Sequence, residues 1–109
     1  MEIDQIQKEY DQLRSRLARL GWMTQGHVWD RGRGGNGPRY QWTGKFAEKT
    51  RTVALSQEQY VAFKEANQTW REAQEILKRM TALSRHFILT TFPNPPRRKA
   101  LIKKRLSLI

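Results

Sequence analysis

Two segments of the chain repeat apolar residues with the three–four spacing of an amphipathic helix. The first seam, in residues 3–20, comprises Ile3, Ile6, Tyr10, Leu13, Leu17 and Leu20. The second, in residues 57–88, comprises Tyr60, Phe63, Ala66, Trp70, Ala73, Leu77, Met80, Leu83 and Phe87. Ser56 and Gln59 have the spacing of a capping box at the start of the second segment. The pattern predicts two helices, over 3–20 and 57–88.

Between these segments the side chains alternate between polar and apolar, as they do in half-buried strands. We predict strands over 26–29, 39–43 and 50–55, joined by turns at 31–37 and 45–49. Tyr40 and Trp42 fall on one face of the second strand. The predicted fold is α+β: an N-terminal helix, a three-stranded antiparallel β-meander, a long C-terminal helix packed against the first, and a basic tail.

The prolines of the C-terminal segment predict where the folded part ends. Pro93, Pro95 and Pro96 exclude a helix there, and the following residues are basic with scattered Leu and Ile. We therefore predict one helix–meander–helix domain over 1–90 and a flexible basic tail over 91–109. The two seams pair either within one chain or between the copies of a homodimer, and the sequence leaves both open.

The basic residues of the chain are concentrated in two blocks. The formal net charge is +11, with 21 Lys and Arg against 10 Asp and Glu. Residues 31–54 hold six bases and one acid, and residues 76–109 hold nine bases and no acid, whereas the other segments are near neutral or acidic. Such an excess predicts a polyanionic partner.

The central block contains the sharpest motif of the chain, an Arg/Gly loop between the first two strands. Its glycines allow the backbone to approach a phosphate, and guanidinium groups bind phosphate in bidentate fashion. The alternative is a solvated hairpin turn. The residues predicted to bind nucleic acid are Arg31, Arg33, Arg39 and Arg51 in the centre, and Arg97, Arg98, Lys99, Lys103, Lys104 and Arg105 in the tail.

The aromatic residues have two interpretations. Trp29, Tyr40 and Trp42 could stack on unpaired bases, but a core between sheet and helices is favoured because the chain has few other bulky side chains to fill one. For the same reason we predict that Trp22 and Trp70 belong to the core.

Several classes of chemistry find no support in the sequence. There is no cysteine, and His27 and His86 lack metal-ligand spacing, so we expect no cofactor or metal. Asp30 and Glu48 make no active site by themselves, and no Walker motif or nucleophile elbow is present. We predict no enzymatic activity, no membrane insertion and a cytoplasmic location.

The chain from Gly37 onward combines Gly37-Pro38, a strand at Lys49–Thr52, the run from Ser56 to Tyr60 and a long helix ending in Leu83-Ser84-Arg85. In this combination it resembles a family of small uncharacterised proteins often encoded near transposase-like genes. Many members of that family have a cysteine segment before the Gly-Pro, where this chain has Arg31 to Gly35. The resemblance implies a mobile-element context and no mechanism.

These observations favour a non-catalytic protein that binds RNA or DNA through its phosphates, and one interpretation is an accessory of a mobile-element enzyme or ribonucleoprotein. A second hypothesis is a helical adaptor that docks on a partner protein through an uncovered seam. A third is a C-terminal segment that lies on a membrane surface.

Overall fold

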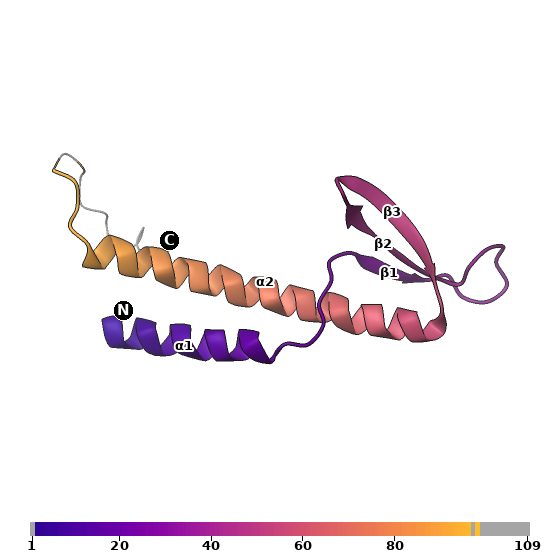
Figure 1. Cartoon of the computed structure of the whole chain (residues 1–109), viewed down its shortest axis with the longest axis horizontal. Helices are drawn as coiled ribbons and strands as arrows, with labels where there is room; N and C mark the ends of the chain where they lie inside the picture. Colours follow the sequence, from indigo (N-terminus) through magenta and orange to yellow (C-terminus); the bar gives the residue numbers. More distant parts are fainter. Residues whose placement is uncertain (1, 97, 99–109) are drawn as a thin grey trace. The chain divides into compact units, whose positions relative to one another are not determined.

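A computed structural model describes residues 2–96 and 98, and the chain divides into two compact units (Figure 1). One unit is Leu20–Ala73, and the other is Met1–Arg19 together with Gln74–Ile109. Helix α2 spans Gln57–Thr91. Its residues up to Ala73 belong to the first of these units, and its residues from Gln74 onward belong to the second. The predicted α+β fold, with two helices packed together and a three-stranded antiparallel sheet, is confirmed. The division at residue 90 stays a prediction.

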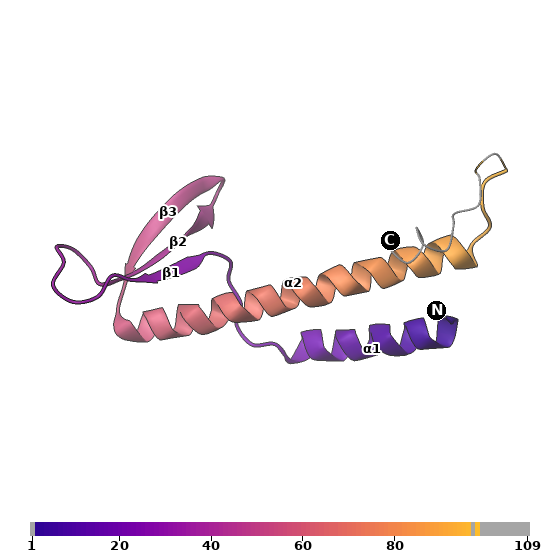
Figure 2. The same ribbon diagram turned by 180° about the vertical axis from the view of Figure 1, so that it is seen from behind.

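In the helical unit, α1 (Ile3–Arg19) lies alongside the C-terminal part of α2 (Figures 1 and 2). Ile6 and Leu13 of α1 are buried, as are Ile76 and Leu83 of α2. This burial of apolar side chains from both helices is the main stabilising contribution within the unit. The predicted end residue Ile3 is 53% exposed, because it begins the helix at the margin of the seam.

The seam of α2 differs from the prediction at one turn. Leu77 was expected in the seam but is 46% exposed, whereas Ile76 is only 2% exposed. Buried and half-buried positions continue from Ile76 to Met80 and Leu83, in steps of four and three. A helix has 3.6 residues per turn, so a face followed over several turns shifts against a fixed three–four pattern. Because Ile76 and Leu77 are both apolar, the sequence does not show which of the two lies on the buried face.

The other unit contains the sheet, with strand order β1-β2-β3 and antiparallel pairing throughout. The strands are β1 (His27–Asp30), β2 (Tyr40–Phe46) and β3 (Lys49–Leu55). The second turn is shorter than predicted, because β2 and β3 extend to a two-residue turn at Ala47 and Glu48. Both turn residues have positive φ, 52° and 64°, as the tight hairpin requires.

One face of the sheet packs on the first part of α2. The rings of Trp42 and Phe63 stack with centroids 5.5 Å apart, and those of Tyr40 and Tyr60 lie 4.8 Å apart. Leu55 is buried on the same face. Tyr40 and Trp42 are therefore half-buried between the sheet and α2, on the side that the sequence favoured for them.

Hydrogen bonds fix the start of α2. Ser56 Oγ accepts from the amide of Gln59 at 3.1 Å, and Gln59 Oε1 accepts from the amide of Ser56 at 3.0 Å. The predicted capping box is confirmed. It satisfies two backbone donors that would otherwise lack partners.

The connector between α1 and β1 is held through its backbone. The amide of Thr24 donates to the carbonyl of Ala66 at 3.2 Å, and Asn67 Nδ2, in a side chain only 3% exposed, donates to the carbonyl of Thr24 at 2.7 Å. The connector therefore docks without inserting a large side chain, and Trp22 is 93% exposed. The prediction that Trp22 belongs to the core is wrong, and Trp70 is half-buried.

Candidate nucleic-acid interface

The Arg/Gly loop between β1 and β2 is closed at its base by one carboxylate. Asp30 Oδ1 accepts from the amide of Gly32 and from Arg39 Nε, both at 2.9 Å, and Arg39 Nη2 reaches Asp30 Oδ2 at 3.3 Å. The amide of Arg31 donates to the carbonyl of Arg39 at 2.7 Å. Asp30 and Arg39 thus form a clamp that joins the two ends of the loop.

Electrostatics at the clamp follow from this geometry. The hydrogen bond from Arg39 and then that from the Gly32 amide hold the pKa of Asp30 below its ordinary value. The same hydrogen bond with Asp30 raises the pKa of Arg39. The guanidinium of Arg39 also lies 4.9 Å from the ring centroid of Tyr40. Of the three loop arginines predicted to grip phosphate, Arg39 already has a carboxylate partner, which compensates its charge.

Arg31 and Arg33 differ from Arg39. Both side chains are exposed, and among the described residues no hydrogen bond or ion pair reaches either guanidinium. Gly32 and Gly34, which follow them, have φ of 75° and 90°, a region that glycine adopts without strain. The loop thus presents two uncompensated guanidinium groups on a backbone with almost no side-chain bulk.

A second basic cluster lies at the tip of the β2–β3 hairpin. Lys45, Lys49 and Arg51 are all exposed there. Lys49 and Arg51 share a face with Phe46, which is itself 66% exposed, and Lys45 lies on the outer face. The guanidinium of Arg51 lies 5.9 Å from the Phe46 ring centroid. Arg51 was predicted as a site residue, but the two lysines beside it were not. Their position at one tip follows from the two-residue turn at Ala47 and Glu48, where the sequence had predicted a turn over residues 45–49.

The outer face of the sheet, opposite the one on α2, carries His27, Trp29, Gln41, Thr43, Lys45, Thr50, Thr52 and Ala54. Trp29 pairs with Gln41, one position away from Trp42, so its ring points away from the core and is 51% exposed. The prediction that Trp29 belongs to the core is wrong. Its ring meets that of His27 edge to face, with centroids 4.6 Å apart at 70°.

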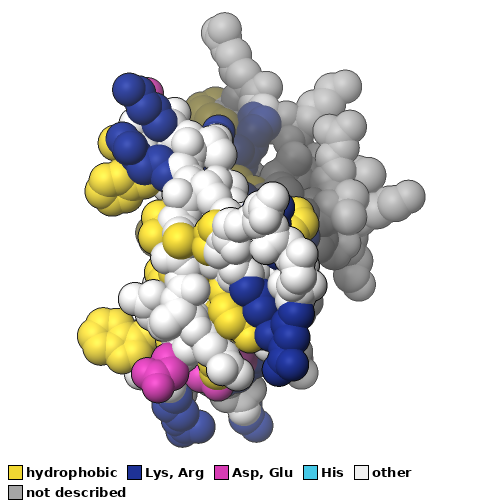
Figure 3. Space-filling view, turned by 90° about the vertical axis from the view of Figure 1, so that its right-hand side faces the viewer, with side chains coloured by type: hydrophobic (Ala, Val, Ile, Leu, Met, Phe, Trp, Pro, Cys, Tyr) yellow, Lys and Arg dark blue, Asp and Glu magenta, His cyan; other side chains and the backbone are white. Residues whose placement is uncertain are grey.

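Seen from the side on which the 31–38 loop lies, Lys and Arg side chains project at several points and few Asp or Glu are visible (Figure 3). Of the two acids in the segment from β1 to β3, Asp30 is taken up by the clamp. The other, Glu48, lies in the hairpin turn. The sheet is therefore positive on the loop and at the tip, with no carboxylate on the outer face between them.

The C-terminal site residues are largely beyond what the structure describes. Arg97, Lys99, Lys103, Lys104 and Arg105 lie outside the described residues. Arg98 is described and exposed; its side chain donates to Asn94 Oδ1, and its amide donates to the carbonyl of Pro95 at 3.3 Å. The contribution of the tail stays a prediction.

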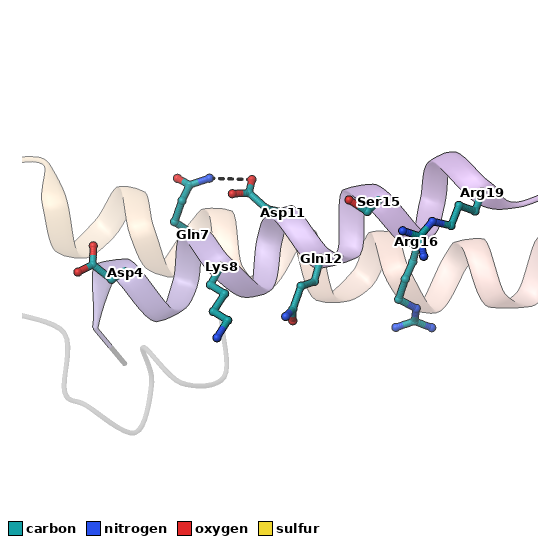
Figure 4. A pocket seen from close by; sticks show the side chains of 8 residues that line it. All are labelled: Asp4, Gln7, Lys8, Asp11, Gln12, Ser15, Arg16 and Arg19. Atoms are coloured by element: carbon teal, nitrogen blue, oxygen red, sulfur yellow. Dashed lines mark hydrogen bonds between the residues drawn. The ribbon is translucent and has the colours of Figure 1, made fainter.

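A hollow along α1 provides no second site. Among the described residues, its lining side chains all come from α1 and spread outward rather than converge (Figure 4): Asp4, Gln7, Lys8, Asp11, Gln12, Ser15, Arg16 and Arg19. Gln7 donates to Asp11 at 3.0 Å, which is an ordinary pair one helical turn apart. Within the described part of the chain, no side chain of another element faces these residues across the hollow.

No group of three or more His, Cys, Asp or Glu in the described part of the chain is placed to hold a metal ion. Within the same residues, no helix is long and apolar enough to cross a membrane.

Comparison with known proteins gives no relative from which a function could be transferred. No family model, no curated protein and no solved structure matches the chain. The resemblance noted from Gly37 onward therefore stays an expectation, and so does the mobile-element context.

Proposed function

We propose that the protein binds nucleic acid without catalysing a reaction, and that its sheet unit contacts phosphates through two basic elements. The Arg/Gly loop supplies Arg31 and Arg33, and the hairpin tip supplies Lys45, Lys49 and Arg51. The basic residues of the tail add a further electrostatic contact. The observation that supports this most is the pair of exposed guanidinium groups on a glycine backbone, next to an arginine that a carboxylate already compensates.

The loop suits phosphate for two physical reasons. A guanidinium presents planar donors that match two phosphate oxygens, and exposed Arg31 and Arg33 need not first break an ion pair. Gly32 and Gly34 flank Arg33, and because they have no side chain the backbone can approach the anion closely. Phosphate contacts give affinity and orientation but no sequence information, so this part of the proposal is for binding without base specificity.

A salt titration tests the proposal directly. Binding of the whole chain to a labelled 12-nucleotide strand and to a 12-base-pair duplex would be measured by fluorescence anisotropy, from about 50 to about 200 mM salt. Each phosphate contact contributes about −0.7 to the log–log slope on a single strand and about −0.9 on a duplex. Replacing Arg31 and Arg33 by alanine should therefore flatten the slope by about 1.4 or 1.8, respectively.

The matched control removes the same charge elsewhere. Arg14 on α1 and Arg71 on α2 are also exposed, and their joint replacement by alanine should leave the slope within about half a unit. Equal slopes for the two double variants would mean that net charge alone attracts the ligand. No binding to either nucleic acid at about 50 mM salt would refute the proposed function.

A second candidate is docking of a partner protein, at the exposed apolar surface of the connector rather than along a helical seam. Trp22 borders a hollow of about 520 Å³ whose other lining residues include Met23, Ala62, Phe63 and Ala66. A fully exposed Trp beside an apolar hollow is typical of a protein-binding anchor. Sedimentation equilibrium of the wild type and Trp22→Ala tests whether this surface pairs two copies. A monomer at all concentrations would exclude the homodimer.

A further inference from the structure

We propose that the outer face of the sheet stacks against unpaired bases, so that the ligand is a single strand. The proposal rests on the proposed function, and it adds the class of nucleic acid and the residue that distinguishes it. Trp29 is the central stacking side chain and His27 positions its ring. Arg31 and Arg33 of the loop and Lys45 at the hairpin tip hold the phosphates on either side. The juxtaposition of an exposed ring with cations at both ends of one acid-free face leads to this inference.

The ring of Trp29 is presented for contact and is also held in place. It lies in β1, whose pairing with β2 fixes the direction of the side chain. The edge-to-face contact with His27 restrains the indole from one side. Half of the side chain is exposed, 51%, which leaves ring surface for a partner. A restrained, half-exposed indole loses little conformational entropy when a base stacks on it.

The surroundings of Trp29 suit bases better than an apolar protein segment. Beside it on the outer face, Gln41 offers an amide that both donates and accepts, and the hydroxyls of Thr43 and Thr52 lie 3.2 Å apart, within hydrogen-bond distance. No carboxylate lies on this face to repel phosphate. The face is polar apart from its aromatic pair and Ala54, so it would bury little apolar area against a protein.

The spacing of the positive charges along the outer face matches a short single-stranded nucleic acid. Arg31 and Arg33 lie in the loop that follows the end of β1 at Asp30. Lys45 shares the outer face with Trp29 and lies toward the other end of β2. From Gln41, opposite Trp29, to Lys45 is roughly 13 Å at about 3.3 Å per residue. At about 3.4 Å per stacked base this spans three or four bases. Bases in a duplex are stacked on one another and cannot use an exposed indole, so a single strand is the fitting occupant.

Binding of four probes to the full chain tests the inference. The probes are a 12-nucleotide oligo(U), the corresponding oligo(dT), a 12-base-pair duplex, and an abasic deoxyribose-phosphate 12-mer that has phosphates but no bases. Trp29→Ala should weaken binding of a base-containing single strand about 5- to 100-fold. It should leave the duplex and the abasic strand unchanged. Trp29→Phe keeps an aromatic ring and should retain most of the affinity.

Trp22→Ala is the matched control, because Trp22 is a more exposed indole outside the sheet face. It should leave all four affinities unchanged. Quenching of indole fluorescence by the single strand should persist in Trp22→Phe and diminish in Trp29→Phe. The amide spectra of the variants show whether each is folded. If the alanine variant is not, Trp29→Thr replaces it, because threonine also removes the ring and is well suited to an exposed strand position.

The outcomes separate this inference from the proposed function. If the single strands bind and depend on Arg31 and Arg33, but Trp29→Ala binds them as tightly as the wild type, the stacking surface is wrong and phosphate binding stands. An equal loss for the abasic strand, or an equal loss in Trp22→Ala, also overturns it. If none of the four probes binds, the proposed function fails, and this inference fails with it.

Discussion

Gly44 allows the indole of Trp42 to lie against the sheet, and its replacement by alanine should destabilise the sheet unit. A Cβ at position 44 would lie 2.4 Å from Trp42 Cζ2 and 2.8 Å from Cη2. Carbon atoms in contact are normally about 3.5–4.0 Å apart, so the ring would have to move by about 1 Å. The φ of Gly44 is not in the left-handed region, so the space taken by the methyl group is the main effect.

The size of the effect follows from what holds the ring. Trp42 stacks on Phe63 at 5.5 Å, and its Nε1 donates to the carbonyl of Gln25 at 3.1 Å. A methyl group forced into a packed site costs about 1–3 kcal/mol, and loss of one hydrogen bond costs about 1 kcal/mol. We therefore expect Gly44→Ala to lower the free energy of unfolding of the sheet unit by about 2–4 kcal/mol.

Urea unfolding followed by circular dichroism measures this change, and the indole N–H resonance of Trp42 reports the bond to Gln25. Gly35→Ala is the control, since nothing lies within 4 Å of its added Cβ and its φ is not in the left-handed region. It should be neutral or stabilise by up to about 1 kcal/mol. If Gly44→Ala unfolds at the wild-type urea concentration with an unshifted indole resonance, the packing argument is refuted.

Three further predictions concern the helices and the clamp. Ile76→Ala should lower the free energy of unfolding by about 2–5 kcal/mol and Leu77→Ala by less than about 1 kcal/mol; equal losses in urea titrations would contradict the observed seam. Ser56→Ala should cost about 1 kcal/mol in the same titration, and an unchanged midpoint would show that the capping box does not stabilise α2. Because Arg39 lowers the pKa of Asp30, the clamp contributes stability above roughly pH 4 and loses it as the pH falls through the lowered pKa. Asp30→Asn should therefore flatten the acid limb of a plot of Tm against pH, and an unaltered limb would contradict the clamp.

The helices and strands were predictable because their signals are local. The three–four spacing marks a helical face within a few residues, and the capping box needs only Ser56 and Gln59. Alternation likewise marks a strand and shows that Tyr40 and Trp42 share a face. None of these inferences requires knowledge of what the element packs against.

The incorrect predictions concern residues whose environment depends on contacts between segments far apart in the sequence. Trp29 was assigned to the core because it is aromatic, but its face depends on which residue of β2 lies opposite. Trp22 was assigned there too, although its connector docks through the backbone and the buried Asn67. The clamp joins Asp30 and Arg39 across a loop, so their partnership becomes visible only once the hairpin register is known. The sequence therefore predicted the basic residues and the Arg/Gly loop of the candidate site. It did not predict which side chains share the outer face of the sheet.

The clamp has a consequence for how the loop can vary. It fixes the ends of residues 31–38 from outside, so the register of β1 and β2 does not depend on what lies between them. Doubling the length of a flexible loop with fixed ends costs only about 0.6 kcal/mol in closure entropy. A peptide tag or a second binding motif inserted between Gly34 and Gly35 should therefore leave the sheet intact. Because of the clamp, the sequence between Asp30 and Arg39 can be exchanged while the pairing of β1 with β2 is kept.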